Sequence, residues 1–179
     1  MKRTFLSITL LILVITLKCF SQSLADLERD PSFKGITIGA PISKYSDILS
    51  FSHVTKGKNV YKVFDSHYLS IFNVSMQEML VVENNGRVYG IFLSKTMAPD
   101  NNGYNIFNPN VLLSWYSNLR SRYGNNSFSL DDMSGTPSIC GMRWKASNVV
   151  LDIVYLFYGT AGDERPQLQY SLYQREDDY

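Results

Sequence analysis

Cysteine and histidine are scarce in this chain, with two residues of each among 179. Cys19 lies in an N-terminal segment that we expect to be removed, which leaves Cys140 without a partner for an internal disulfide. His53 and His67 belong to no paired motif of the His-x-x-x-His or Glu-x-x-His kind. Because imidazole and thiolate are the usual zinc ligands, the sequence predicts neither a metal site nor a cofactor.

The motifs of common hydrolases are absent as well. A serine nucleophile needs a histidine and an acid beside it, and the sequence has no Gly-x-Ser-x-Gly. A glycosidase needs two carboxylates that face each other across a cleft, whereas Asp131 and Asp132 are neighbours in a polar segment and project in different directions. These absences favour a protein that binds over one that catalyses.

Neither sign of charge dominates. The chain has 17 basic and 16 acidic residues, and removal of Lys2, Arg3 and Lys18 with the N-terminal segment leaves 14 basic against 16 acidic. The remaining charges are scattered singly, and a basic stripe typical of nucleic-acid binding is missing. We therefore expect no nucleic-acid partner.

Long apolar runs are missing except at the N-terminus. Lys2 and Arg3 precede the apolar stretch Phe5–Leu17, and Ser21 and Gln22 follow it. This is the layout of a secretory signal peptide, and the stretch is shorter than the roughly 20 residues of a membrane-spanning helix. We expect residues 1–22 to be a signal peptide and the mature chain to reach the periplasm or the exterior without a transmembrane segment. Lys18 before Cys19 argues against lipid anchoring there, where a small residue is usual.

The first half of the mature chain begins with a polar segment, 23–33, that we predict to be a flexible lead-in. A short strand is predicted next, over 35–39. An amphipathic helix over 41–49 follows it, because apolar residues recur in that segment at helical spacing. Residue patterns with a period of two then predict four strands, over 59–65, 67–74, 78–83 and 87–95. Asn85-Gly86 between the last two strands favours a tight hairpin turn.

The second half repeats this order after a loop over 96–107. Asn108 and Pro109 begin a predicted helix that ends at Gly124, with one apolar stripe at spacings of three and four. Alternating residues then predict strands over 142–145, 149–157 and 167–174. The sequence predicts one α+β domain over 34–179, in which two short helices pack on an antiparallel meander. Its halves, 34–97 and 108–175, fit a loose duplication of a helix followed by strands.

Two stretches carry a resemblance to a known group of proteins. One is FKGITIGAPISKYSDIL with the hairpin ENNGRVYGIFLSK, and the other is LLSWYSNLRSRYG with MRWKASNVVLDIVYL and LQYSLY. Together they resemble small, exported, uncharacterised α+β proteins of Bacteroidetes, over most of the mature chain. The resemblance implies an α+β fold and a place in the cell envelope or outside the cell, and it implies no activity and no site residues. The architecture is also similar, more weakly, to that of outer-membrane assembly lipoproteins and of tandem-repeat enzyme inhibitors.

Three groups of residues are candidates for function. Tyr104 and Phe107 are aromatic residues in a polar loop, and we predict that they contact a ligand or pin the loop against the sheet. Asp152 interrupts an apolar strand, and we predict a structural ion pair with Arg143 or Lys145. We expect Cys140 to be a small buried apolar residue.

We therefore expect a non-enzymatic binding domain of the bacterial envelope whose partner is a protein or another envelope component. One alternative is a small hydrolase with a site built on Asp152, His67 or Cys140. Another is a structural subunit of the envelope.

Overall fold

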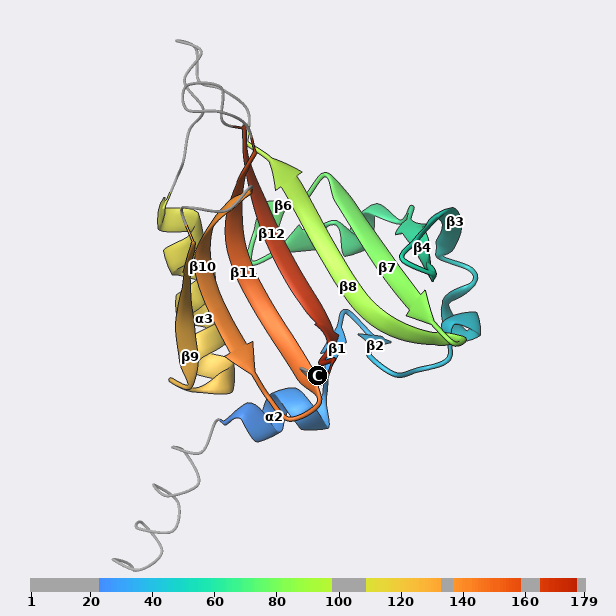
Figure 1. Ribbon diagram of the computed structural model, residues 1–179, viewed down its shortest axis with the longest axis horizontal. Coiled ribbons are helices and arrows are strands. Elements are labelled where there is room, and N and C mark those ends of the chain that lie inside the picture. The colour runs from blue at the N-terminus through green and yellow to red at the C-terminus, as the bar shows by residue number, and fades with distance from the viewer. Residues whose placement is uncertain (1–22, 98–108, 133–136, 159–164, 177–179) are drawn as a thin grey trace, which may run out of the picture.

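The computed structural model describes residues 23–97, 109–132, 137–158 and 165–176. Eight strands form one antiparallel sheet (Figure 1). In sheet order they are β3 (Leu49–Thr55), β4 (Lys58–Val63), β7 (Glu78–Asn84), β8 (Arg87–Thr96), β12 (Arg165–Gln174), β11 (Val149–Tyr158), β10 (Ser138–Lys145) and β9 (Ser127–Asp132).

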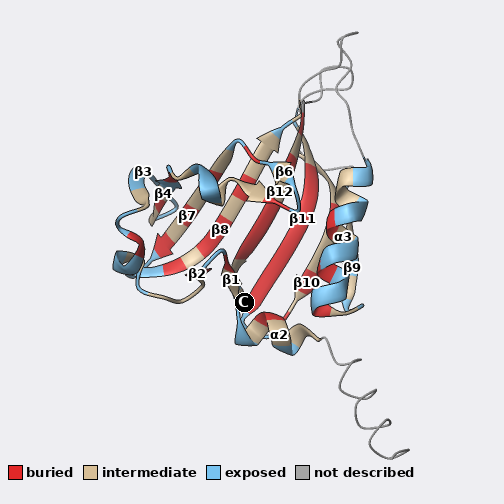
Figure 2. Ribbon diagram, turned by 180° about the vertical axis from the view of Figure 1, so that it is seen from behind, coloured by how far each residue is buried: buried red, intermediate tan, exposed pale blue. Residues whose placement is uncertain are grey.

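Two α-helices, α2 (Leu24–Arg29) and α3 (Pro109–Tyr123), accompany the sheet, which confirms the α+β class. Helix α3 packs on the face formed by β10 and β11, and the two views from opposite sides place it behind the sheet in Figure 1 and in front of it in Figure 2. The smaller elements are two hairpins and two short 3-10 helices: β1 (Ser32–Phe33) with β2 (Ile36–Thr37), β5 (Ser70–Ile71) with β6 (Val74–Ser75), η1 (Ile42–Tyr45) and η2 (Ser66–Tyr68).

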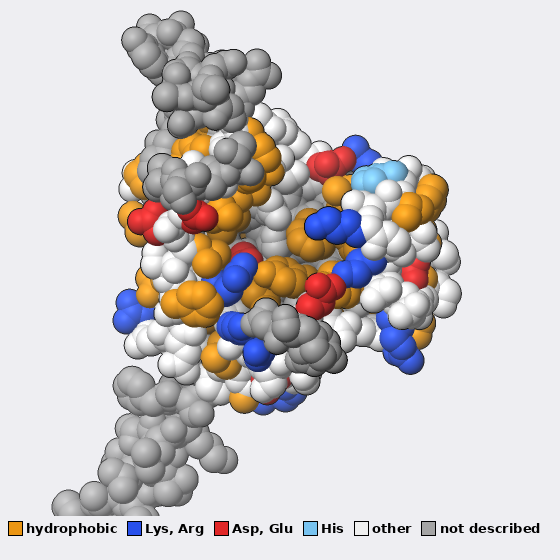
Figure 3. Space-filling view, viewed as in Figure 1, with side chains coloured by type: hydrophobic (Ala, Val, Ile, Leu, Met, Phe, Trp, Pro, Cys, Tyr) orange, Lys and Arg blue, Asp and Glu red, His pale blue; other side chains and the backbone are white. Residues whose placement is uncertain are grey.

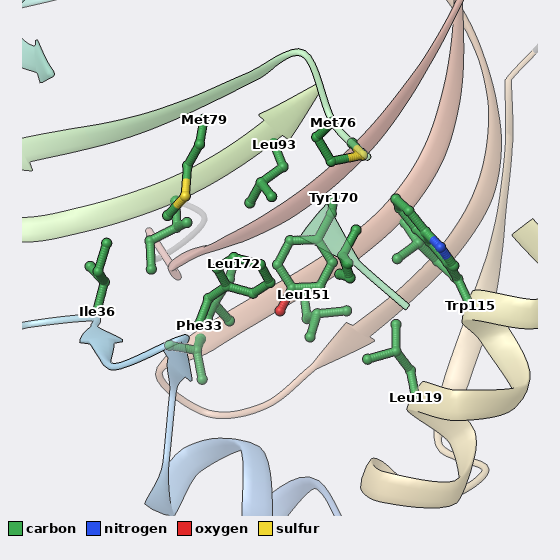
Figure 4. Packing of buried hydrophobic residues seen from close by; sticks show 14 of the residues in the cluster. Phe33, Ile36, Met76, Met79, Leu93, Trp115, Leu119, Leu151, Tyr170 and Leu172 are labelled. Atoms are coloured by element: carbon green, nitrogen blue, oxygen red, sulfur yellow. The ribbon is translucent and has the colours of Figure 1, made fainter. Parts of the chain in front are cut away.

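The hydrophobic core lies between the sheet and α3. Trp115, Leu119 and Tyr123 of the predicted helical stripe are buried, and Leu112 and Tyr116 pack beside them. Side chains of β11 and β12 point toward Trp115 and Leu119, and those of β7 and β8 continue the same layer (Figure 4). One core therefore runs across strands of both halves of the chain.

Most of the predicted strands are confirmed, together with the hairpin turn. Residues 59–65, 78–83, 87–95, 142–145, 149–157 and 167–174 fall on β4, β7, β8, β10, β11 and β12. Asn85 and Gly86 have φ values of 52° and 77°, as a type I′ turn requires. The helix over 109–123 is confirmed too, and Gly124 at φ 80° ends it by donating its N–H to the carbonyl of Arg120 at 2.9 Å.

The amphipathic helix predicted over 41–49 is wrong. The chain makes only the single 3-10 turn η1, and the edge strand β3 begins at Leu49. The backbone here bonds to the β7–β8 hairpin instead: Ile42 N–H donates to the carbonyl of Gly86 at 3.0 Å, and Val88 N–H donates to Ala40 at 2.9 Å. These tertiary hydrogen bonds replace the bonds within a helix that the apolar spacing favoured.

Two further segments differ from prediction. In place of a strand over 67–74 the chain forms η2 and the β5–β6 hairpin, because Phe72 and Asn73 adopt left-handed φ values of 45° and 65° and reverse the chain. In place of a flexible lead-in over 23–33 the chain forms α2, whose Leu27 is fully buried. Leu24 also packs against the core, and the Glu28 carboxylate accepts from the Ser147 N–H, so apolar and polar contacts together hold this short helix.

Each half of the sheet consists of four strands in chain order, β3, β4, β7 and β8 in the first half and β9 to β12 in the second, with the separate β5–β6 hairpin between β4 and β7. The halves meet where their last strands, β8 and β12, pair in antiparallel register. The two four-strand runs share one order, but the first is directly preceded only by the 3-10 turn η1 where the second is preceded by α3, and the duplication stays a prediction. The predicted signal peptide, residues 1–22, lies outside the described residues. In the described part of the chain, no helix has the length and apolar character needed to cross a membrane.

Candidate functional site

The sheet has an open face, opposite α3, that no described helix covers. Strand register places one residue of each strand in a single row across this face. From β9 to β3 the row contains Phe128, Arg143, Asp152, Ser171, Phe92, Leu80, Lys62 and Ser50. Figure 3 shows this face hollowed in its middle, with Lys, Arg and hydrophobic side chains around the hollow.

Asp152 forms the centre of a hydrogen-bonded network. Arg143 donates from Nε and Nη2 to the two carboxylate oxygens of Asp152, each at 2.7 Å. The Tyr173 hydroxyl donates to Asp152 Oδ2 at 3.0 Å and accepts from Arg143 Nη2 at 3.1 Å. This two-pronged contact confirms the predicted ion pair and selects Arg143 as the partner.

The network holds Tyr173 in one orientation. Its ring stacks on Phe92 of β8, with centroids 6.1 Å apart and an angle of 16° between the planes. Burial raises the pKa of the Tyr173 hydroxyl, and the neighbouring Asp152 carboxylate raises it further. The hydroxyl therefore stays protonated at neutral pH and acts as a fixed donor.

A second polar group lies beside this network at the C-terminal end of β12. The ammonium group of Lys58 lies 3.7 Å from the centre of the Tyr89 ring and 2.5 Å from the Glu176 carboxylate. A cation over an aromatic face is attracted by the negative charge of the ring. Lys58 thus links β4 to β8 and to the end of β12.

A pocket of about 160 Å³ opens between these two groups. Its lining comes from β8, β10, β11 and β12 and the residues just after β12: Tyr89, Arg143, Lys145, Val150, Tyr173, Arg175 and Glu176. Three of the lining residues are cations, namely Arg143, Lys145 and Arg175. Arg143 pairs with Asp152, and Lys58 pairs with the lining residue Glu176.

A second pocket, of about 220 Å³, lies on the helix side between α3 and the two small hairpins. Its cations serve structural contacts: Lys34 donates to the backbone carbonyl of His67 and to Ser70 Oγ, and Arg122 lies 3.6 Å from Asp30. Phe72 at its mouth packs edge-on against Trp115, with ring centroids 6.3 Å apart. Lys34 thus joins the two hairpins, Arg122 joins α3 to the end of α2, and Phe72 joins the β5–β6 hairpin to α3. Because these groups serve structural contacts, the open face is the stronger candidate site.

The residues proposed for a hydrolase are not brought together. Asp152 lies on the open face, whereas Cys140 is paired with Tyr155 on the helix face of the sheet. His67 belongs to η2, beside Lys34 and Tyr68. Cys140 is half-buried, not buried as predicted, and burial raises the pKa of its thiol. Among the residues that the structure describes, no three His, Cys, Asp or Glu side chains gather closely enough to hold a metal ion.

Tyr104 and Phe107 lie outside the described residues, so their contact with a ligand stays a prediction. Sequence reasoning missed Phe92, Tyr89, Tyr173 and Arg175. The period of two in 167–174 does assign Tyr173 to the face opposite Leu172. It does not reveal which strands lie beside β12, and that adjacency is what brings Phe92, Tyr89 and Arg143 to Tyr173.

Comparisons of this chain with protein-family models, with curated proteins and with solved structures find no match.

Removing the central carboxylate should weaken the fold measurably. In Asp152→Ala, the guanidinium of Arg143 keeps its partly buried position without its carboxylate, and we expect the free energy of unfolding to fall by about 3 kcal/mol. The apolar double variant Asp152→Leu/Arg143→Met removes both charges and should be less destabilised than the single variant. Urea denaturation measures both, and equal losses would show that the ion pair is not what matters here.

Proposed function

We propose that this chain is an exported binding domain of a bacterial cell envelope, and that it binds a partner protein through the open face of its sheet. The observation that supports this most is the row of aromatic and cationic side chains across that face. Aromatic residues and arginine are the residue types that contribute most binding energy at protein interfaces.

Preorganisation supports the same proposal. Arg143 and Tyr173 are fixed by Asp152, and Phe92 is fixed by stacking on Tyr173, so these side chains lose little conformational freedom on binding. Phe128, at the β9 end of the row, is 45% exposed and offers apolar surface to a partner. The sheet therefore combines a rigid polar centre with an exposed aromatic edge, which is a suitable arrangement for a specific protein contact.

Site-specific photo-crosslinking tests this proposal. A photoreactive amino acid replaces Phe128 on the open face in one variant and Leu113 in another. Leu113 is the matched control, since it is 60% exposed on α3, the helix that covers the opposite face. In cells that export the protein, we expect one protein to crosslink at position 128 and not at position 113.

A charge-reversal variant shows whether that crosslink reports specific binding. Lys62→Glu changes the sign of a half-exposed residue in the same row without touching the core. We expect it to reduce the crosslink at position 128 severalfold. Equal crosslinking from positions 128 and 113, or none from position 128, would contradict the proposal.

A further inference from the structure

The pocket on the helix side contains two buried hydroxyl groups, those of Tyr123 on α3 and Tyr170 on β12. The two residues are only 2% and 3% exposed, and both line the pocket. Neither hydroxyl has a hydrogen-bond partner among the described residues. A buried phenol usually has a partner, because burial of a hydroxyl without one is unfavourable. An acceptor atom inside the pocket would satisfy both donors.

The two hydroxyls lie near each other, and both stay protonated. Burial raises the pKa of Tyr170, and the nearby Tyr123 hydroxyl raises it further. Burial likewise raises the pKa of Tyr123. Both groups are therefore neutral hydrogen-bond donors at neutral pH. Because the two cations at this pocket serve the structural contacts described above, a neutral acceptor oxygen is the group that the hydroxyls require.

The size and the lining of the pocket limit the ligand further. Its volume is about 220 Å³, and a cavity of about 150 Å³ is already large enough for benzene. Phe33 packs beside Tyr170 with ring centroids 5.3 Å apart, and Leu119 lies on the other side of the tyrosine (Figure 4). Aromatic rings attract one another in tilted and edge-on contacts at such distances. The pocket therefore suits one aromatic ring with a small substituent that carries the acceptor oxygen.

Phe72 lines the same pocket in a backbone conformation that phenylalanine rarely adopts. Its φ of 45° lies in the left-handed region, where a bulky side chain is an outlier. Phe72 and Asn73 are the two central residues of the turn between β5 and β6, and this kind of turn favours asparagine and glycine. The turn itself does not explain an aromatic residue here. Its partly exposed ring offers a ligand one more aromatic wall.

We propose that this pocket binds a small neutral molecule made of a single aromatic ring and a carbonyl group, with the ring against Phe33 and Phe72 and the oxygen at the two tyrosine hydroxyls. The inference goes beyond the proposed function, because the site lies on the helix side of the sheet and needs no partner at the open face. Acetophenone is the probe. Its control is α-methylstyrene, which has the same shape with a CH₂ group in place of the oxygen. NMR titration of the protein measures both affinities.

Tyr170→Phe removes only the hydroxyl. We expect it to weaken acetophenone binding about tenfold, because one hydrogen bond is lost, and to leave the binding of α-methylstyrene unchanged. It should not lower the urea midpoint, since the hydroxyl has no partner among the described residues. Tyr45→Phe is the matched control with the opposite expectation. The Tyr45 hydroxyl accepts from the Thr37 N–H at 3.0 Å outside this pocket, so its loss should lower the midpoint and leave the affinity unchanged.

Phe72→Asn tests the aromatic wall separately. The variant loses a partly exposed ring and gains a residue suited to the left-handed conformation, so it should remain folded. We expect it to weaken the binding of both compounds severalfold. No binding of acetophenone, equal affinity for the two compounds, or unchanged acetophenone binding by Tyr170→Phe would overturn the inference. Benzoate that binds more tightly than acetophenone would overturn the neutral ligand in favour of a carboxylate.

Discussion

Replacement of Trp115 by alanine is expected to lower the free energy of unfolding by about 4 kcal/mol. Trp115 is fully buried at the centre of the layer between α3 and the sheet, where it packs against Phe72. Its removal deletes a large apolar surface and leaves a cavity, because the long strands β11 and β12 cannot close in on the gap. Urea denaturation followed by circular dichroism measures the loss.

The two buried tryptophans, Trp115 and Trp144, differ in whether the indole N–H has a hydrogen-bond acceptor, and substitution of each by phenylalanine tests this difference. The indole N–H of Trp115 has no acceptor among the described residues, whereas that of Trp144 donates to the carbonyl of Gly124 at 3.3 Å. Trp144→Phe should therefore cost about 1 kcal/mol more than Trp115→Phe, because only the former loses a hydrogen bond. If Trp115→Ala lowered stability by less than the phenylalanine variants do, the position of Trp115 in the core would be wrong.

Gly141→Ala is expected to destabilise the protein by about 3 kcal/mol or more. A β-carbon at this position would lie 2.2 Å from the carbonyl oxygen of Ile153 and 2.7 Å from the α-carbon of Val154. Both atoms belong to the backbone of the neighbouring strand β11, which is fixed by β10 on one side and β12 on the other. The clash can be relieved only if the middle of the sheet moves.

Gly90→Ala is the matched control, since Gly90 faces the same open surface from the other half of the sheet. Its added β-carbon would lie 2.6 Å from the ring of Phe92, which is the far end of a flexible side chain. Phe92 can rotate away at a cost of about 1 kcal/mol, so Gly90→Ala should remain folded. It should also weaken binding at the open face, because Phe92 leaves its stack on Tyr173. Equal destabilisation by the two alanine variants would show that backbone contact at Gly141 is not limiting.

Long segments with one clear period could be predicted from the sequence. For helix α3 the sequence has a candidate N-cap residue, an apolar stripe at helical spacing and a terminating glycine, and β8 and β11 are ten-residue strands of strand-forming residues, so local signals and tertiary packing agree there. The two edge strands β3 and β9 were missed. On an edge strand fewer side chains are buried, so the alternation that identifies a strand is weak.

The candidate site was predictable only in part. A carboxylate in an apolar strand needs a partner, and this rule led from Asp152 to a pair with Arg143 or Lys145, of which the structure selects Arg143. The other members of the site come from β8, β10, β11 and β12 and from the residues just after β12, and β8 is far in sequence from the rest. No local residue pattern in the sequence indicates that β12 lies between β8 and β11 in the sheet.

For α3 and the long inner strands, the sequence by itself determined the helical or two-residue period, the hairpin turn at Asn85-Gly86 and the side chains that face the core, because these follow from side-chain geometry along a few consecutive residues. Only the tertiary structure decided which strands lie side by side, and therefore that Arg143 and Lys145 of β10 and Arg175 just after β12 line one pocket. Which distant strands pair depends on the free energy of the whole sheet. The sequence of a single strand therefore does not indicate its neighbours in the sheet.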